Sequence, residues 1–238
     1  GGCWECPDLF PLIAEEGRKN WVLLVSLNPG GIAGGSGTQY FIGDWDGTTF
    51  TTEQSESKWI DYGRDNYAGV TFNDAPDNAR VFLGWMSNWI YAREIPTEIW
   101  RSSMTLPRKL ELASINDEVK LISQPIYPAD GTVHRFTINT SEDSSITFTT
   151  NTGEVVISFI AAEKIFTIDR SKAWLANLVE QPQRSAAISG SEIEIEIFID
   201  NGSLELFAPA AALSMTSLHL LYAEDVTIAV GGAAKYHA

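Results

Sequence analysis

The stretch EIEIEIFIDNGSLELF, residues 192–207, decides the fold class of this chain. Glutamate and isoleucine alternate from Glu192 to Ile197, and a period of two residues puts alternate side chains on opposite faces of a β-strand. Asn201-Gly202 then separates two strand-like runs, as is typical of a tight β-hairpin. The stretch predicts two paired strands with buried isoleucines. It places the glutamates in a solvated row rather than in a catalytic cluster.

The rest of the chain has the same strand-rich character. Short runs of β-branched and aromatic residues are bounded by Gly, Asn, Asp and Pro, and helix signals are scarce. In the first half the runs group in fours, which is typical of propeller blades. They lie near 4–10, 21–27, 38–44 and 48–52, and near 66–72, 81–91, 100–112 and 118–123. We predict an all-β chain in which residues 1–125 form about two four-stranded blades of a partial β-propeller.

The second half differs in composition from the first. Only one tryptophan, Trp174, follows residue 125. Besides the alternating stretch, strand-like runs lie near 133–139, 145–150, 154–160, 164–169, 203–207, 215–221 and 225–230. Roughly eight strands with frequent turns are typical of a β-sandwich. We therefore predict that residues 126–238 form a C-terminal β-sandwich.

Charge and hydrophobicity exclude several classes of partner. The 238 residues carry a net charge of -15, with a pI near 4.5, so the surface repels nucleic acid and anionic membranes. No apolar run approaches the roughly 20 residues that span a bilayer. We expect no nucleic-acid or membrane partner, whereas neutral substrates remain open. The sequence does not determine localisation, and an extracellular or periplasmic place is compatible with it.

Two short motifs invite a metal or redox interpretation. Cys3 and Cys6 form a C-x-x-C pair, which can be a redox centre or half of a zinc site. Neither is favoured, because no second such pair occurs and the histidines at 134, 219 and 237 lie far along the chain. The DWDG segment, residues 44–47, lacks the rest of a calcium loop and is predicted to form a turn. We expect no metal site and no cofactor.

Several motifs occur together in a characteristic order and spacing. They are WECPDLF (4–10), GTQYFIGDWDG (37–47), DYGRDNYAGVTF (61–72), GWMSNW (84–89), WRSSMTLPRKL (100–110) and FIDNGSLELF (198–207). In this order they resemble glycoside hydrolase family 32, the β-fructosidases: invertases, inulinases and levanases. The resemblance covers nearly the whole chain. It implies a five-bladed β-propeller followed by a β-sandwich, and retaining hydrolysis of β-fructosidic bonds in sucrose, inulin or levan.

The resemblance also implies roles for individual residues. Glu5 matches the glutamate of the family's E-C-P motif, which is the general acid/base. Cys6 beside it is expected to line the wall of the sugar pocket. Trp85 resembles an aromatic residue that lines this pocket, although the nearby Trp89 competes for that role and either could be a core residue. Asp65 and Tyr67 lie on the inner strand of the next blade, where we expect them to face the same funnel and contact substrate.

Two carboxylates near these motifs are weak candidates for the catalytic partner of Glu5. Asp8 lies three residues from Glu5, and odd spacing on a regular strand puts two side chains on opposite faces. We therefore expect Asp8 to be structural and to bind backbone amides at the strand end. Arg64-Asp65-Asn66 is similar to the family's R-D-P motif, but it follows E-C-P instead of preceding it.

The nucleophile expected from the resemblance is not in this sequence. The family's W-M-N-D-P-N-G and R-D-P motifs are both absent, and the motif order makes the first blade here the third or fourth of the propeller. We expect the chain alone to be inactive towards fructose-containing oligo- and polysaccharides. A complementary chain, or self-association through open blade edges, could complete it.

Two other functions compete with the enzyme hypothesis. The chain could be a non-catalytic carbohydrate-binding or structural β-sandwich module that carries a relic half-propeller. It could also be an unrelated all-β lectin, which the motif order argues against.

Overall fold

The computed structural model describes residues 2–129, 131–173, 181–200, 202–221 and 226–237. Within these ranges the chain forms antiparallel strands and two short 3-10 helices, η1 (Pro76–Asn78) and η3 (Pro209–Ala211). No helix of the described residues has the length and hydrophobicity needed to cross a bilayer. The all-β prediction is confirmed. Trp174 and Asn201 lie outside the described residues.

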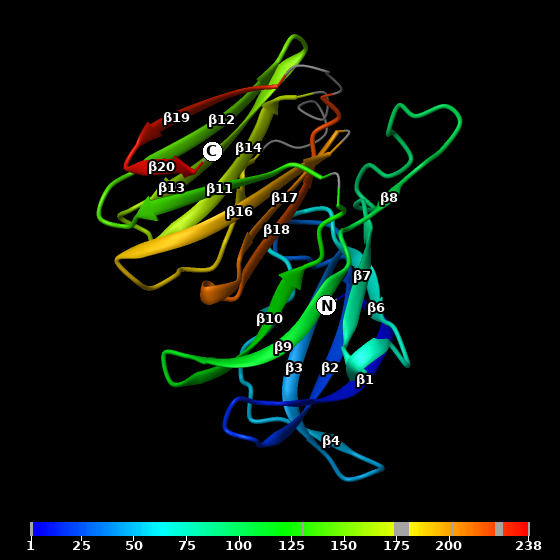
Figure 1. The fold of residues 1–238 in the computed structure, drawn as a ribbon. Coiled ribbons are helices and arrows are strands. Elements are labelled where there is room, and N and C mark those ends of the chain that lie inside the picture. Colours follow the sequence, from blue (N-terminus) through cyan, green and yellow to red (C-terminus); the bar gives the residue numbers. More distant parts are fainter. Residues whose placement is uncertain (1, 130, 174–180, 201, 222–225, 238) are drawn as a thin grey trace.

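The first 125 residues form two curled sheets that stand side by side (Figure 1). The first sheet has the order β1-β2-β3-β4 and contains β1 (Cys3–Ile13), β2 (Lys19–Asn28), β3 (Gly37–Trp45) and β4 (Phe50–Thr51), with β5 (Lys58–Trp59) beside β3. The second has the order β10-β9-β7-β6 and contains β6 (Tyr67–Thr71), β7 (Val81–Met86), β9 (Arg108–Ile115) and β10 (Glu118–Pro125), with β8 (Ser103–Met104) beside β7. Each path follows chain order, as the two predicted blades require.

The blades pack against each other through alternate residues of their strands. Val22 and Leu24 of β2 are buried against Phe82 of β7 and Leu110 of β9. Strict alternation therefore supplies one apolar face for each blade. The outer faces are less covered. Trp4 on β1, like Val70 and Phe72 at the end of β6, is at least half exposed.

Some strand boundaries differ from those predicted. The run at 81–91 ends at Met86, because the chain turns through residues 87–94. The run at 100–112 divides into β8 and β9. Pro107 lies between them and cannot donate a ladder hydrogen bond. The short strands β5, β15 (Gln183–Arg184) and β20 (Ala234–His237) carried no sequence signal.

The second half is a sandwich of two five-stranded sheets. One has the order β18-β17-β16-β11-β20 and contains β11 (Val133–Asn139), β16 (Glu192–Asp200), β17 (Ser203–Ala208), β18 (Leu213–Leu218) and β20 (Ala234–His237). The other has the order β15-β14-β13-β12-β19 and contains β12 (Ser144–Thr150), β13 (Gly153–Ile160), β14 (Ile165–Lys172), β15 and β19 (Thr227–Gly232). The predicted boundary between residues 125 and 126 falls in the connection between β10 and β11.

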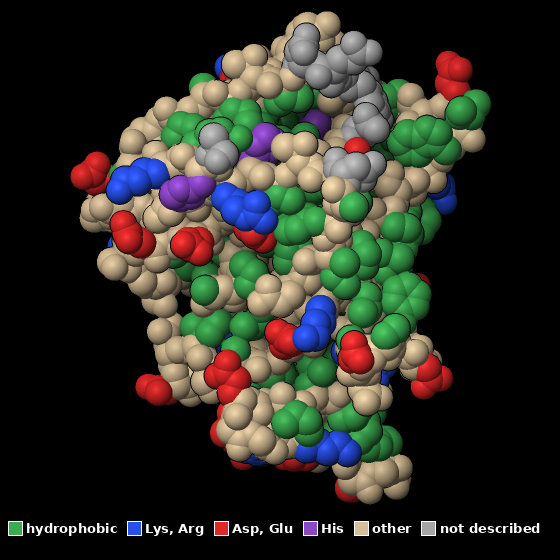
Figure 2. All heavy atoms as spheres, in the orientation of Figure 1, with side chains coloured by type: hydrophobic (Ala, Val, Ile, Leu, Met, Phe, Trp, Pro, Cys, Tyr) green, Lys and Arg blue, Asp and Glu red, His purple; other side chains and the backbone are tan. Residues whose placement is uncertain are grey.

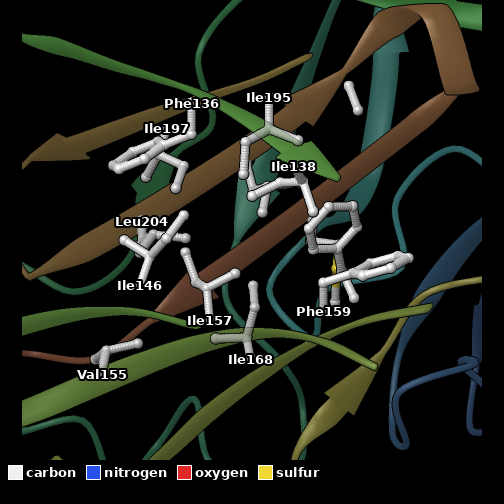
Figure 3. Close-up of a cluster of buried hydrophobic side chains, with 14 of the residues drawn as sticks. Phe136, Ile138, Ile146, Val155, Ile157, Phe159, Ile168, Ile195, Ile197 and Leu204 are labelled. Carbon is white, nitrogen blue, oxygen red and sulfur yellow. The ribbon is translucent and has the colours of Figure 1, made fainter. Parts of the chain in front are cut away.

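The alternating stretch behaves as its pattern predicts. The isoleucines of β16 point into the core between the sheets, where Ile195 and Ile197 face Ile157 and Ile168 of the opposite sheet (Figure 3). Glu192 and Glu194 are exposed on the other face. β16 and β17 pair as far as Asp200 and Ser203, as the predicted hairpin requires.

The blades and the sandwich meet through a buried polar junction. The segment before β6 runs along β18, where the Tyr62 amide donates to the Ser214 carbonyl (2.8 Å) and the Asp65 amide to the Thr216 carbonyl (3.1 Å). Gly63 allows this approach, since a Cβ there would lie 2.1 Å from the backbone of Thr216. Arg108 is fully buried at the same place. The segment thus joins the second blade to the sandwich.

Candidate active site

Glu5 lies at the start of β1, just before a β-bulge. Glu5 is opposite Ser26 of β2, but Asp8, three residues further on, is opposite Leu24. One extra residue is therefore inserted at Cys6-Pro7, where Cys6 has a φ of 47°. The extra residue shifts the alternation of side chains by one position, so Glu5 and Asp8 project to the same face. The expectation that Glu5 and Asp8 project to opposite faces is wrong for this reason.

Both acidic side chains reach the neighbouring blade. The Tyr67 hydroxyl donates to Glu5 Oε2. Asp8 Oδ2 accepts from the Thr71 amide and the Thr71 hydroxyl, each at 2.7 Å. Asp8 therefore bonds a backbone amide, but on β6 rather than on its own strand. It holds the two blades together, in agreement with the structural role predicted for it.

Tyr67 orients the Glu5 carboxylate. The Tyr67 side chain is buried, and burial, followed by the hydrogen bond to Glu5, raises the pKa of its phenol well above the usual value. The phenol therefore remains a donor to Oε2 across the physiological pH range. Oε1 of Glu5 has no hydrogen-bond partner among the described residues, so it is the oxygen that a ligand could meet.

A cavity of about 590 Å³ opens over this pair. Its walls come from β1, the end of β2 and the turn that follows β7. The lining residues are Glu5, Cys6, Asn28, Tyr67, Trp89, Ile90, Arg93 and Glu94. The structure therefore brings together three of the residues selected from the sequence: Glu5, Cys6 and Tyr67.

The two tryptophans of GWMSNW have different places. Trp89 is 47% exposed and lines the cavity. Trp85 lies behind it, with its ring centroid 5.1 Å from that of Trp89 and 6.2 Å from that of Tyr67. Trp85 thus supports two cavity residues without lining the cavity, and Trp89 is the aromatic wall. Aromatic rings of this kind can present an apolar face to a sugar.

Asp65 does not reach the cavity, contrary to the expectation that it contacts substrate. Its side chain is fully buried in the junction. Oδ2 accepts from Arg170 Nη1 and from the Leu218 amide, both at 2.8 Å, and Oδ1 accepts from the Tyr91 hydroxyl. Alternation would put Asp65 and Tyr67 on the same face, since they are two residues apart, but Asp65 precedes β6. The decisive partner is an arginine of the sandwich.

Asn28, Ile90, Arg93 and Glu94 were not selected from the sequence, although they line the cavity. Three of them lie in the turn at 87–94, whose first part falls in the strand-like run predicted near 81–91. Glu94 matters most, because it is a second carboxylate in the same cavity as Glu5. Glu94 lies between the runs predicted near 81–91 and 100–112, where an acidic residue in a connection gave no signal of this placement.

The motifs that invited a metal or redox interpretation lie in the following surroundings. Cys3 and Cys6 are exposed free thiols. Asp46 in DWDG accepts from the amides of Thr48 and Thr49, both at 2.7 Å, and so forms the predicted turn. Within the described ranges, no three His, Cys, Asp or Glu side chains are grouped so that they could hold a metal ion.

A second cavity, of about 900 Å³, lies where the outer strands of both blades approach the sandwich. Tyr40, Gln54 and Glu118 are among its lining residues, together with Ile188 and Leu213 of the sandwich. Gln54 is occupied by backbone contacts, since its amide donates to the carbonyls of Tyr40 (3.0 Å) and Glu56 (2.8 Å). None of the residues selected from the sequence lies there.

Similarity to known proteins agrees with this geometry. The sequence model described as the Glycosyl hydrolases family 32 N-terminal domain matches residues 1–125, and that of the Glycosyl hydrolases family 32 C terminal matches residues 107–227. A levanase of Bacillus subtilis is 48% identical over 132 residues, which are 53% of this chain and 20% of the levanase. An extracellular exo-inulinase of Aspergillus niger is 35% identical over 91% of this chain and 50% of its own length.

Solved structures show the same arrangement of strands. The exo-inulinase of Aspergillus awamori superposes with a TM-score of 0.86 at 27% identity, over 98% of this chain and 55% of the inulinase. The β-fructofuranosidase of Schwanniomyces occidentalis, complexed with fructosyl-erythritol, shares the fold with a TM-score of 0.81 at 23% identity, over 97% of this chain and 57% of its own. The match to each of these three fungal proteins covers nearly all of this chain but only about half of the fungal protein's own length. By both family models and by fold, it belongs to glycosyl hydrolase family 32.

Proposed function

We propose that this chain supplies the acid/base half of a β-fructosidase active site, for retaining hydrolysis of β-fructosidic bonds in sucrose, inulin or levan. The observation that carries the proposal is the Glu5 carboxylate, held by Tyr67 at the wall of an open cavity. Relatives named levanase, exo-inulinase and invertase support this substrate class. The net charge of -15 suits a neutral sugar.

The proposed chemistry uses Glu5 twice. Its carboxyl proton passes to the leaving oxygen while a second carboxylate attacks the anomeric carbon and forms a fructosyl ester. Glu5, now ionised, removes a proton from water as the water attacks that ester, which releases fructose and restores both carboxyl groups. Tyr67 would fix one oxygen of Glu5 and leave the other for the substrate. Cys6 and Trp89 would contact the sugar.

We propose that the nucleophile comes from outside these 238 residues, either from another part of a longer protein or from a complementary polypeptide. No W-M-N-D-P-N-G motif occurs in the sequence. The outer blade faces could receive such a chain, because apolar side chains are exposed there. On the side that carries β6, β7 and the loop leading to β8, Figure 2 shows hydrophobic side chains grouped together. Val70, Phe72, Ile99 and Met104 are exposed in this part of the chain. Association with a second copy is the alternative use of the same faces.

Fructose release from sucrose and inulin tests this proposal. The chain would be assayed alone and after mixing with the N-terminal half of the Aspergillus awamori exo-inulinase. We expect no release by the chain alone, release by the mixture, and loss of that release with Glu5→Gln. Substantial hydrolysis by the chain alone would sink the proposal of a separate nucleophile. Glu94→Gln would then show whether the second cavity carboxylate attacks the sugar.

A binding function without chemistry is the second candidate. The exposed ring of Trp89 beside the cavity is the observation that favours it. In that case inulin oligomers would bind the chain, as measured by calorimetry. The mixture with the inulinase half would release no fructose, and Glu5→Gln would leave the affinity unchanged.

We also propose that the protein acts outside the cell. The exo-inulinase relatives of Aspergillus are named extracellular, and this supports the proposal. Detection of the protein in the culture medium of its source, compared with washed cells, tests this location.

A further inference from the structure

One wall of the cavity over Glu5 is the turn at residues 87–94, and buried contacts with both blades and with the sandwich fix this turn. Trp89, Ile90, Arg93 and Glu94 of this turn line the cavity. Asn88 and Tyr91 of the same turn are buried and point away from it. The conformation of the wall therefore depends on what these two buried side chains contact.

Asn88 fastens the turn to both blades. Its Nδ2 donates to the carbonyls of Arg64 (2.8 Å) and Gly34 (3.0 Å), while its Oδ1 accepts from the Ile90 amide (3.0 Å). Ser36 of the first blade accepts from the Trp89 amide through its hydroxyl (3.3 Å). These contacts fix the start of the turn.

Tyr91 fastens the middle of the turn to the sandwich. Its hydroxyl donates to Asp65 Oδ1 and accepts from Arg170 Nη2 at 2.8 Å. Arg170 belongs to β14, in the sandwich sheet of order β15-β14-β13-β12-β19, and its Nη1 donates to Asp65 Oδ2 at 2.8 Å. The guanidinium carbon also lies 5.3 Å from the centre of the Tyr91 ring. Tyr91, Asp65 and Arg170 thus form a closed triangle of contacts.

This triangle permits one arrangement of its hydrogen bonds. Tyr91 is 1% exposed, Asp65 0% and Arg170 3%. Burial, and then the charge of Asp65, raises the pKa of the Tyr91 phenol well above its usual value, so the hydroxyl keeps its proton. Its single proton goes to Asp65, and its lone pairs face Arg170. Loss of the guanidinium leaves Asp65 as an unpaired buried charge. Loss of the phenol leaves Asp65 Oδ1 and Arg170 Nη2 without the partner they now have, so either change favours movement of the turn.

We propose that Arg170 of the sandwich is a positioning residue for the candidate active site. It holds Tyr91, and through Tyr91 it sets the place of the turn that carries Trp89. The sandwich therefore shapes the cavity without touching a ligand. That the cavity receives a sugar rests on the proposed function. The position of Trp89 can be measured without any substrate.

Fluorine NMR of the chain labelled with fluorinated tryptophan tests this proposal. The Trp89 signal is assigned by Trp89→Phe. The test variants are Tyr91→Phe, which removes one hydroxyl, and Arg170→Lys. The lysine keeps the positive charge but lacks the two Nη donors of the guanidinium. The matched control is Tyr127→Phe, because the Tyr127 hydroxyl also bonds a carboxylate, Glu196 Oε2, at 2.9 Å.

We expect both test variants to shift the signals of Trp89 and Trp85 and to leave that of Trp21, in the first blade, in place. The control should move neither cavity signal. An unchanged Trp89 signal in Tyr91→Phe and in Arg170→Lys would overturn the proposal. Equal movement of every tryptophan signal would also overturn it, since that result means general loosening. If one variant fails to fold, the other decides.

Affinity for inulin oligomers then separates this proposal from the proposed function. If the wild type binds, we expect Arg170→Lys to bind roughly tenfold more weakly, with unchanged affinity in Tyr127→Phe. If the wild type alone does not bind, the fluorine signals still decide the role of Arg170, and fructose release by the mixture decides the proposed function. Binding by the wild type and Arg170→Lys with equal affinity would contradict the positioning role.

Discussion

The cavity and the junction use the same residue types in opposite ways. At the cavity, Glu5 is exposed, meets a single tyrosine and keeps one oxygen available. At the junction, Asp65 is buried, meets a tyrosine, an arginine and a backbone amide, and has nothing left to offer a ligand. The two residues lie on adjacent blades, and both belong to motifs of the family. Glu5 and Asp65 are both carboxylates, but only Asp65 faces a buried arginine. The groups around a carboxylate therefore decide whether it is available to a ligand.

The largest effect should come from removing the central arginine of the junction. Arg108 donates to Asp61 Oδ2 (2.8 Å) and to Glu205 Oε2 (2.7 Å), and it is fully buried. Burial raises the pKa of Glu205, and Arg108 is the main group that opposes this rise. We expect Arg108→Met to lower the free energy of unfolding by about 3–5 kcal/mol, because two buried carboxylates lose their partner. Urea unfolding followed by circular dichroism measures this loss.

Arg135 provides the matched control for Arg108. Its Nε lies 2.9 Å from Glu196 Oε1, but the arginine side chain is 55% exposed. Water screens such a pair, so Arg135→Met should cost less than about 1 kcal/mol. Equal losses in the two variants would show that the junction is no more dependent on its charges than the surface is.

A pH effect of intermediate size is expected from His219 in the sandwich. Burial lowers the pKa of His219 from 6.5 to about 4. Between these values the unfolded chain binds a proton that the folded chain does not bind. The free energy of unfolding should therefore fall as the pH decreases from about 6.5 to about 4, by roughly 3 kcal/mol in all. Urea unfolding at several pH values measures the slope.

His219→Asn should flatten this dependence. The asparagine carbonyl can replace His219 Nδ1, which accepts from the Leu221 amide at 3.0 Å. If the variant and the wild type lose stability with the same slope, then His219 is not the group responsible.

A smaller effect is expected where Asp8 joins the two blades. Asp8→Ala removes the acceptor for the Thr71 amide and hydroxyl, each now at 2.7 Å. We expect a loss of about 1–2 kcal/mol in the free energy of unfolding, since the site is partly open to water. Asp44→Ala is the control, because Asp44 is exposed and faces Arg18 at 3.5 Å. A loss in Asp44→Ala as large as in Asp8→Ala would refute the cross-blade role.

The sequence predicted the strands well because their signals are local. Alternation in residues 192–197 and turn residues after each run need no knowledge of the rest of the chain. Glu5 was found through its motif. The bulge at Cys6 was not predictable, because its effect on side-chain direction appears only against the register of β2.

Long-range partners explain the remaining errors. Arg170, which takes Asp65 away from the cavity, lies 105 residues further along the chain. Trp89 lines the cavity because the chain leaves β7 after Met86, where the composition still resembles a strand. In both cases the deciding contact is tertiary, and no local pattern encodes it.

The most direct test of the difference between cavity and junction is urea unfolding of Glu5→Gln and Asp65→Asn side by side. Glu5→Gln retains an acceptor for Tyr67 in an exposed site, so its free energy of unfolding should match that of the wild type to within about 0.5 kcal/mol. Asp65→Asn leaves Arg170 without its buried counter-charge and should lose about 3 kcal/mol or more. Equal losses, or a larger loss in Glu5→Gln, would contradict the assignment of Glu5 to function and Asp65 to structure.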